Sequence, residues 1–264
     1  MTSAPHFFDT HAHLNNQQFD TDRGDVRVRM SAAGVHRSCE IGYDLPSSQA
    51  AIQSAQENTT CWAVVGVQPN HPEVLQDPTW LDQLDAMATQ PKVVAIGEIG
   101  FDLHYAIAPV AVQEALFRAQ ISLAATHRLP IVIHSREAHD DTLRVLRDVR
   151  HPYGVIMHSF SGDVAYAEAC VAIGCMLSLS GPITFKNNSQ MHAVVDAIGL
   201  EHLLIETDSP YLSPHPLRGK RNEPTNVPLV AAYIATRKGL LVTEVAKKTW
   251  QNANRLFGLA DDNV

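Results

Sequence analysis

Eight short apolar segments with β-strand character recur along the chain and alternate with segments of helical periodicity. Continuous apolar strands are typical of parallel sheets that helices cover on both faces. The alternation therefore restricts the chain to α/β folds assembled from repeated βα units. The predicted strands cover residues 7–9, 36–41, 62–67, 93–97, 131–133, 154–157, 176–180 and 203–205.

The segments between these strands place apolar residues three or four positions apart, which is the spacing of one helix face. Glycines such as Gly34 and Gly174 follow two of these segments and indicate helix ends. Residues 242–257 predict a last amphipathic helix, which we expect to serve packing. Examples of the apolar faces are Val26, Met30 and Ala33; Val112, Leu116, Ala119 and Leu123; and Val164, Ala167 and Val171.

Chain length decides between the two α/β architectures that this alternation allows. The chain has 264 residues, and a (β/α)8 barrel, or TIM barrel, takes about 250. Eight βα units within that length favour the closed barrel over the alternative, an open doubly wound sheet. Because no linker or low-complexity stretch divides the sequence, we expect residues 1–264 to form a single domain.

Composition excludes several classes of protein. Apolar residues make up 45% of the chain, which excludes disorder. The sequence contains no run of about 18 apolar residues, so it predicts no membrane span. The first residues carry neither a cationic nor an apolar segment, so we predict no secretory signal and a cytoplasmic location. The four cysteines form no Cys-x-x-Cys pair, and we expect reduced, mostly buried thiols.

Net charge limits how the chain can bind a polyanion. With 20 Lys+Arg against 28 Asp+Glu, the formal charge is −8, so the overall field does not attract a nucleic acid. A local group of cationic side chains would be needed. Histidine is enriched, at 14 residues, and imidazole is both an acid/base group and a metal ligand.

Imidazole and carboxylate side chains follow five of the predicted strands. Because side chains alternate along a strand, Asp9, His11 and His13 face one side together. In a barrel the carboxyl ends of all strands meet at one mouth, where such a cluster favours bound cations. Six candidate ligands predict two divalent metal ions, with a carboxylate able to bridge them. The six are His11, His13, Glu98, His134, His158 and Asp208.

Five loop sequences at these strand ends form an ordered set. They are Phe8-Asp9-Thr10-His11-Ala12-His13-Leu14, Gly97-Glu98-Ile99-Gly100-Phe101-Asp102, His134-Ser135-Arg136, His158-Ser159-Phe160-Ser161-Gly162, and Glu206-Thr207-Asp208-Ser209-Pro210-Tyr211-Leu212 with Arg218-Gly219-Lys220-Arg221-Asn222-Glu223-Pro224. The set resembles the TatD family of metal-dependent deoxyribonucleases, within the amidohydrolase-like hydrolases. The resemblance extends from residue 8 to the Asn254-Arg255-Leu256-Phe257 ending.

The resemblance implies a division of the six ligands between two metals. It makes His11, His13 and Asp208 ligands of one metal. It makes His134 and His158 ligands of the other, with Glu98 as the bridge. One loop departs from the family's usual Gly-Val-His-Pro-His turn and reads Gly66-Val67-Gln68-Pro69-Asn70-His71-Pro72. Gln68 and Asn70 can hydrogen-bond a phosphate, but neither can supply a proton at neutral pH.

The predicted centre suits hydrolysis of a phosphodiester. Two cations about 3.5–4 Å apart would activate a bridging water and stabilise the entering and leaving oxygens of an in-line displacement. Asp208 is the candidate base, and Glu98 is the second catalytic candidate because it bridges. Glu206 alternates with Asp208 and either orients a ligand histidine or is a buried structural carboxylate paired with an arginine.

Candidate substrate contacts lie in loops on the same side of the predicted barrel. His104 and Tyr105 could stack on a base or cap a phosphate. Cationic side chains in these loops offer a local rim for phosphate oxygens, unless salt bridges within the loops occupy them. They are Arg136, Arg218, Lys220 and Arg221.

We therefore expect a DNase that acts as a 3′–5′ exodeoxyribonuclease on single-stranded or frayed DNA. We expect it to be a monomer that neither binds a membrane nor needs an obligate protein partner. Histidine ligands suit zinc or nickel, but the resemblance implies magnesium, so we rank Mg or Mn first for activity. The alternative is a hydrolase of small phosphoesters, lactones or amides, or an aminoacyl-tRNA deacylase, with the same dinuclear site. A non-catalytic metal-binding protein would lack a ligand or the Asp208 base, and the sequence has them all.

Overall fold

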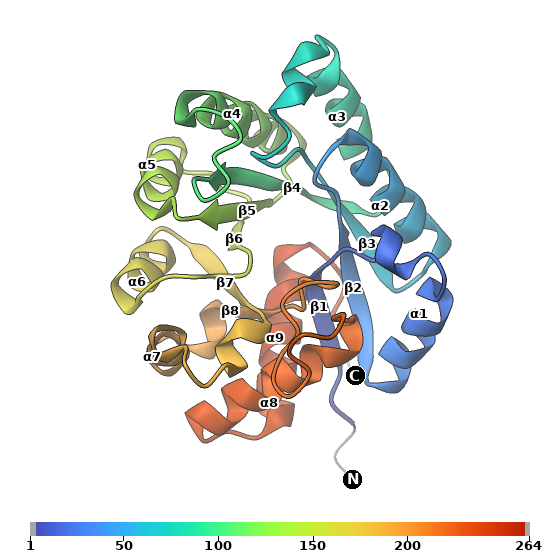
Figure 1. The fold of residues 1–264 in the computed structure, drawn as a ribbon, viewed down its shortest axis with the longest axis vertical. Helices are drawn as coiled ribbons and strands as arrows, with labels where there is room; N and C mark the ends of the chain where they lie inside the picture. Colours follow the sequence, from blue (N-terminus) through green and yellow to red (C-terminus); the bar gives the residue numbers. More distant parts are fainter. Residues whose placement is uncertain (1–3, 262–264) are drawn as a thin grey trace.

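The computed structural model describes residues 4–261, and its centre is one parallel sheet of eight strands in the order β1 to β8 (Figure 1). The two edges of the sheet meet where Ala12 forms a parallel bridge with Ser209, just after β8. This contact closes the sheet into a barrel, so the (β/α)8 prediction is confirmed. The strands are β1 (Phe7–Ala12), β2 (Val35–Ile41), β3 (Cys61–Val65), β4 (Val93–Asp102), β5 (Ile131–Arg136), β6 (Val155–Met157), β7 (Cys175–Leu179) and β8 (Leu203–Ile205).

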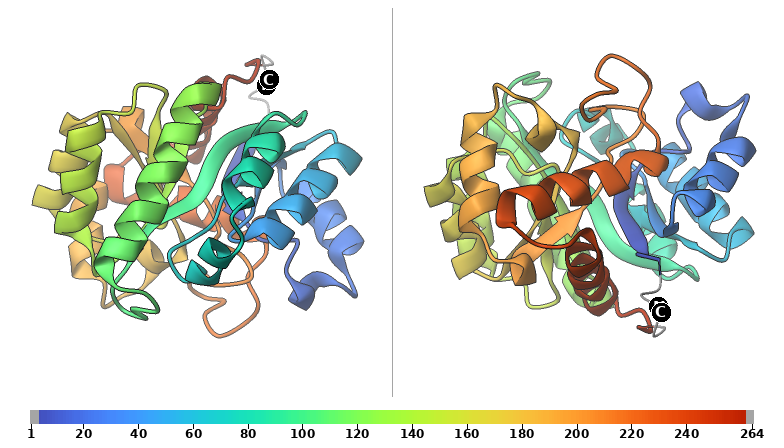
Figure 2. Two further views of the ribbon diagram at one scale, coloured as in Figure 1. Left: turned by 90° about the horizontal axis from the view of Figure 1, so that it is seen from above. Right: turned by 90° about the horizontal axis from the view of Figure 1, so that it is seen from below.

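Helices surround the barrel (Figures 1 and 2). The side chain of Asp163 caps α6 by accepting a hydrogen bond from the backbone N–H of Tyr166, as expected for a helix that begins there. The helices are α1 (Arg23–Ala32), α2 (Leu45–Glu57), α3 (Trp80–Ala88), α4 (Val110–His127), α5 (His139–Val149), α6 (Val164–Ala172), α7 (Ser189–Ala197), α8 (Val227–Lys238) and α9 (Val242–Leu256). Short 3-10 helices are η1 (Gln17–Phe19), η2 (Pro72–Gln76), η3 (Gly181–Thr184), η4 (Leu200–His202) and η5 (Pro224–Asn226).

Strand β4 continues to Asp102 and so passes the predicted end at residue 97. Its glycines allow close contact with β5. A Cβ on Gly97 would lie 2.6 Å from the Val132 side chain, and one on Gly100 would lie 2.1 Å from the His134 carbonyl oxygen. Glu98, Gly100 and Asp102 therefore share one face of this strand.

Helix α9 covers one end of the barrel. Trp250, Ala253 and Phe257 belong to the same buried cluster as side chains from all eight strands. Trp250 also contacts Phe8, near the start of β1, with ring centroids 6.1 Å apart. The covered end is therefore the amino-terminal one, and the predicted packing role of this segment fits the structure. The strand side chains of the cluster are Phe8, Cys39, Ile41, Val64, Val94, Ala95, Val132, Ile156, Met176 and Leu204.

The cysteines are structural thiols. Cys39, Cys61, Cys170 and Cys175 are all buried and free, as the sequence predicted. Burial raises the pKa of Cys61 to about 12, so this thiol stays neutral and unreactive at physiological pH. Among residues 4–261, no helix is long and apolar enough to cross a membrane.

Candidate metal centre

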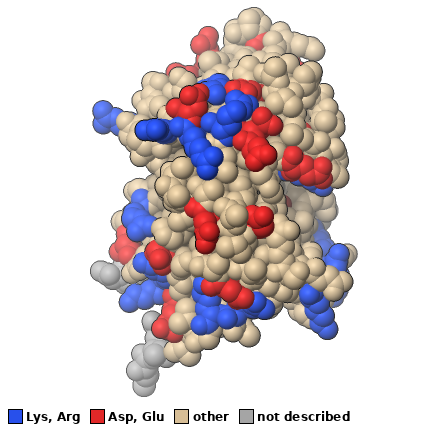
Figure 3. Space-filling view, turned by 90° about the vertical axis from the view of Figure 1, so that its left-hand side faces the viewer, with Lys and Arg blue, Asp and Glu red and all other residues tan. Residues whose placement is uncertain are grey.

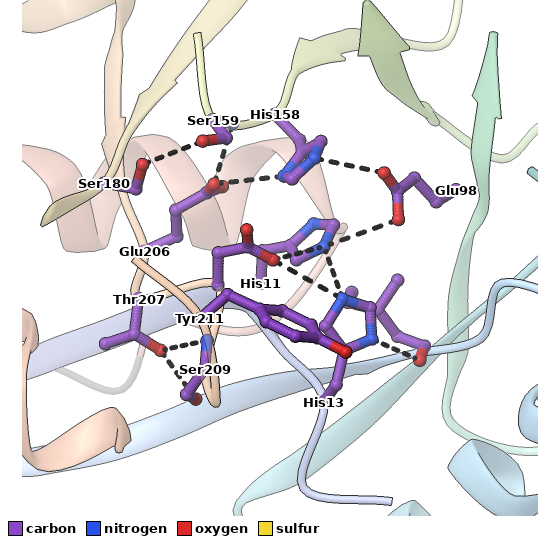
Figure 4. Close-up of polar contacts among 12 residues, drawn as sticks. His11, His13, Glu98, His158, Ser159, Ser180, Glu206, Thr207, Ser209 and Tyr211 are labelled. Atoms are coloured by element: carbon purple, nitrogen blue, oxygen red, sulfur yellow. Dashed lines mark hydrogen bonds and ion pairs between the residues drawn. The ribbon is translucent and has the colours of Figure 1, made fainter. Parts of the chain in front are cut away.

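The six predicted ligands lie together at the carboxyl-terminal end of the barrel. Five strands contribute, because each places its polar side chains where the apolar strand ends. Figure 4 shows four of the six pointing toward one another. They are His11 in β1 and His13 just after it, Glu98 in β4, His134 in β5, His158 directly after β6, and Asp208 in the segment after β8.

His11, His13 and Asp208 form one half of the cluster. The Nε2 atoms of His11 and His13 are 3.2 Å apart. The Asp208 Oδ1 atom lies 3.7 Å from Nε2 of His11 and 3.5 Å from Nε2 of His13. Three donor atoms of the residue types that bind divalent cations therefore face one point.

Glu98 joins this half to a second one. Its Oε1 atom lies 2.6 Å from Nδ1 of His134 and 3.1 Å from Nε2 of His158. Its Oε2 atom lies 3.9 Å from Nε2 of His11, and the rings of His11 and His158 stack with centroids 3.8 Å apart. One carboxylate thus spans both groups of histidines, which is the arrangement that a bridging ligand requires.

Hydrogen bonds on the far side of three imidazoles determine which nitrogen faces the cluster. Nδ1 of His13 donates to the carbonyl oxygen of Ile41 at 3.1 Å. Nδ1 of His158 lies 3.1 Å from Oε1 of Glu206, as Figure 4 shows. A histidine that binds a metal is held in this way, with one nitrogen on a carbonyl or carboxylate and the other free for the metal.

His134 is oriented in the opposite sense. Its Nε2 atom lies 3.0 Å from Oδ2 of Asp102, so its Nδ1 atom faces Glu98. Asp102 is fully buried, and the same oxygen accepts a hydrogen bond from Nδ2 of Asn70 at 3.0 Å. Asp102 was not among the predicted site residues, although it lies four residues after Glu98 and therefore on the same face of β4.

The charges of the cluster fit a divalent cation. Burial raises the pKa of Glu98, but the facing imidazoles of His158 and His134 outweigh it and hold this pKa well below its usual range. Burial lowers the pKa of His158, but Glu98 and Glu206 outweigh it and hold this pKa well above its usual range. Burial lowers the pKa of His11, and His158 and His13 lower it further. Without a metal, a proton on His158 therefore balances Glu98, and a cation can take its place.

The donor atoms are also close enough to share ions. Three overlapping sets each have all their donor atoms within 4.8 Å of one another. The mixture of imidazole nitrogen and carboxylate oxygen suits several divalent metals. The residues present therefore fit a metal centre. The sets are His11, His158 and Asp208; His11, His13 and Glu98; and Glu98, His134 and His158.

A cavity of about 720 Å³ lies over the cluster and connects it with the predicted substrate contacts. Arg136 and Tyr105 both line this cavity. The guanidinium of Arg136 lies over the Tyr105 ring, 4.8 Å from its centroid, and the ion pairs of the described residues do not include Arg136. His104 is exposed and pairs with Glu137 at 2.8 Å, outside the cavity lining.

The other predicted cationic residues do not belong to the cavity lining. Arg218 stacks over Phe185, with its guanidinium 4.5 Å from the ring centroid, and Lys220 is exposed. Arg221 forms ion pairs with Asp22 at 2.6 Å and with Glu223 at 2.9 Å. Its charge is therefore engaged within the protein, which is the alternative that the sequence left open for these residues.

Two features of the wider structure bear on substrate binding. Gln68 and Asn70, which depart from the usual turn, both line the cavity.

On the outer face of the barrel that Figure 3 presents, basic and acidic side chains are interspersed. This face shows no broad basic surface, whereas Arg136 lines the cavity over the candidate centre.

Known proteins resemble this chain over most of its length. The family model described as "TatD related DNase" matches residues 8–258. The "uncharacterized metal-dependent hydrolase YabD" of Bacillus subtilis is 42% identical over 253 residues, covering 95% of this chain and 98% of that protein. The "3′-5′ ssDNA/RNA exonuclease TatD" of Klebsiella pneumoniae is 34% identical, covering 97% of this chain and all of that protein. The crystal structure of YJJV, a TatD homolog from Escherichia coli, superposes with a TM-score of 0.87 at 28% identity, covering 96% of this chain and 98% of that one.

Proposed function

This chain belongs to the TatD family of metal-dependent hydrolases, and we propose that it is a 3′–5′ exonuclease that hydrolyses phosphodiester bonds of single-stranded DNA. The observation that carries the proposal is the position of Glu98, whose two oxygens face the two histidine groups. A shared carboxylate between two ligand sets is typical of two-metal phosphodiester hydrolysis. The name of the Klebsiella relative supports the substrate class and the direction.

Two divalent cations complete the proposed centre. His11, His13 and Asp208 would hold one, His134 and His158 would hold the other, and Glu98 would be shared. When bound, the pair supplies Lewis-acid activation of water and neutralises charge on the phosphodiester. Magnesium or manganese is our first choice for activity, with zinc or nickel as alternatives.

The chain's own residues then have separate tasks. Asp208 accepts the proton of the attacking water, because its Oδ1 atom faces the histidine pair and its carboxylate also lines the cavity. Glu206 and Asp102 hold the rings of His158 and His134 in the orientation that presents the free nitrogen. Arg136 binds a non-bridging phosphate oxygen, because it lines the cavity and the ion pairs of residues 4–261 do not engage its charge.

The experiment that tests this proposal uses metal-stripped protein and 5′-labelled single-stranded DNA. Magnesium, manganese and zinc are added back separately. We expect a ladder of shortened labelled products with at least one metal, and no ladder with the Asp208→Asn variant. Substrates with a blocked 3′ end test the direction, because a 3′–5′ exonuclease must leave them intact.

An aryl phosphodiester serves as the control substrate. If the protein cleaves this small diester but leaves the DNA intact, the nuclease proposal is overturned and the alternative small-molecule hydrolase is supported. Release of the labelled terminal nucleotide at once, without a ladder, would overturn the proposed direction. Absence of cleavage of either substrate with every metal would contradict phosphodiester hydrolysis itself.

A further inference from the structure

Exposed apolar side chains gather on two loops at the mouth of the barrel. Tyr105 is 59% exposed and Ile107 is 58% exposed, in the segment between β4 and α4. Tyr211 is 49% exposed and Leu212 is 37% exposed, in the segment after β8. Large apolar side chains that remain exposed beside a cavity indicate a binding surface, because packing does not require them there.

The two loops face each other across the candidate metal centre. Strands β4 and β8 are four positions apart in the eight-stranded barrel, so their carboxyl ends lie on opposite sides of the mouth. Both Tyr105 and Tyr211 line the cavity that also contains Glu98 and Asp208. The centre therefore lies between two aromatic rings.

Tyr211 is held in place by polar and ring contacts. Its hydroxyl oxygen accepts a hydrogen bond from Nδ2 of Asn16 at 3.3 Å. Its ring meets His13 edge-on, with centroids 6.2 Å apart, and Figure 4 shows the two side by side. A ring fixed next to a predicted ligand is ready to receive a flat group beside the reacting phosphate.

Tyr105 is held from its backbone. Its N–H donates to Oδ1 of Asp102 at 2.9 Å, the carboxylate whose other oxygen orients His134. The guanidinium of Arg136 lies over the ring. On this side, therefore, a stacking surface and a cation for phosphate lie together, and Tyr105 is linked to the centre through Asp102.

We propose that Tyr105 and Tyr211 form an aromatic clamp on which two bases of a single-stranded polynucleotide stack, one on each side of the phosphate that is cleaved. The inference rests on the proposed function and specifies its substrate class. Aromatic stacking accepts every base, because each base has a flat face. It also supplies affinity that does not depend on charge, which suits a chain with a net charge of −8. A small ester has no second flat group to reach across the mouth.

The clamp predicts a selective loss of polynucleotide binding. Stacking of one base on one ring is worth about 1–3 kcal/mol, so each of Tyr105→Ala and Tyr211→Ala should weaken oligonucleotide binding about tenfold. The double variant should lose about a hundredfold, because the rings lie apart and act independently. Tyr105→Phe and Tyr211→Phe keep the stacking surface and should stay within about threefold of the parent.

Two measurements test the clamp. Fluorescence anisotropy follows a labelled oligothymidylate binding to the metal-stripped protein, where cleavage does not interfere. The second measurement uses metal-loaded protein that carries only the tyrosine substitution. The rate of oligonucleotide hydrolysis divided by the rate of aryl phosphodiester hydrolysis should fall about tenfold in each alanine variant. Tyr153→Ala is the matched control, because Tyr153 is 38% exposed and precedes β6 at the opposite end of the barrel.

The outcomes separate the clamp from the function on which it rests. A selective loss with alanine, retention with phenylalanine and no change with Tyr153→Ala supports the clamp. Equal loss of oligonucleotide and small-diester hydrolysis overturns it, because the rings would then only support the metal centre. Unchanged binding in both alanine variants also overturns it, while leaving a nuclease that works. Failure of the unaltered protein to cleave DNA with any metal overturns the proposed function and the clamp with it.

Discussion

The backbone N–H of Asp208 donates a hydrogen bond of 2.8 Å to the carbonyl oxygen of His11. Two residues after His11, the N–H of His13 donates to the carbonyl oxygen of Ser209, the residue that follows Asp208, also at 2.8 Å. These bonds join β1 to the segment after β8, and they place the Asp208 carboxylate 3.7 Å from Nε2 of His11. The contacts that close the barrel therefore also assemble one half of the candidate metal centre.

Removing the Thr207 hydroxyl should weaken this closure. Oγ1 of Thr207 donates to Oδ2 of the fully buried Asp9 at 2.6 Å, and its N–H donates to Oδ1 at 2.9 Å. Thr207→Val keeps the shape but leaves the buried carboxyl one donor short, which costs about 1–3 kcal/mol. Urea denaturation of metal-free protein measures this loss. Thr207→Ser keeps the hydroxyl and is the control; equal stability of the valine and serine variants would show that the bond does not hold the closure.

Glu206 should control metal affinity through His158. Its Oε1 atom contacts Nδ1 of His158 and accepts a hydrogen bond from the N–H of Ser159 at 2.7 Å. Loss of such an outer partner of a ligand histidine lowers metal affinity about 10–100-fold. We expect this for Glu206→Ala and a smaller loss for Glu206→Gln, whose amide oxygen still accepts. Calorimetric titration of stripped protein measures both; identical affinity in the alanine variant and the parent would exclude the orienting role.

Metal binding should stabilise the fold as well as support hydrolysis. The six predicted ligands come from five different strands or the segments after them, so a bound ion links parts of the barrel that are far apart in sequence. A ligand present at 100 times its dissociation constant stabilises a protein by about 2.7 kcal/mol, and each kcal/mol raises Tm by about 2–4 °C at this size. We expect a chelator to abolish activity and lower Tm by several degrees, with both restored by excess magnesium or manganese. A Tm unaffected by the chelator would contradict occupancy of the cluster.

The predictable parts of this molecule follow from local patterns. The apolar runs that indicate β1 and β5 end at polar residues, and the rule that barrel sites form at strand ends brings His11 and His134 together without knowledge of the structure. Alternation along a strand likewise placed Glu206 near a ligand. These signals are local because they depend only on residue type and on a spacing of a few positions.

The unpredictable parts depend on distant segments or on backbone groups. The partner of His13 is the carbonyl oxygen of Ile41, and a backbone oxygen has no sequence signature. Arg221 pairs with Asp22, 199 residues away in the chain, so no local pattern shows that its charge is engaged. Asp102 was given no role because the predicted strand ended at residue 97, whereas β4 continues to Asp102 and its glycines allow it to pack closely against β5.

Arg37 should hold the amino-terminal end of the barrel independently of the metal centre. Its guanidinium lies between the rings of Trp62 and Trp250, 5.1 and 4.8 Å from their centroids, and donates to the carbonyl oxygen of Ala260 at 2.9 Å. Arg37 is only 8% exposed, so Arg37→Ala removes packing, two cation–π contacts and hydrogen bonds together. We expect a loss of about 3 kcal/mol in the free energy of unfolding.

Arg37→Ala should leave metal affinity unchanged. Arg37 packs on Trp250 of α9, and this helix covers the end of the barrel opposite the candidate metal centre. Arg255→Ala is the matched control, since Arg255 is exposed on α9 and an exposed substitution changes stability by no more than about 0.5 kcal/mol. Urea denaturation measures stability, and calorimetric titration well below the midpoint measures metal affinity. Loss of metal affinity in folded Arg37→Ala protein would show that the two ends of the barrel are coupled. Stability equal to that of Arg255→Ala would show that Arg37 does not fix α9.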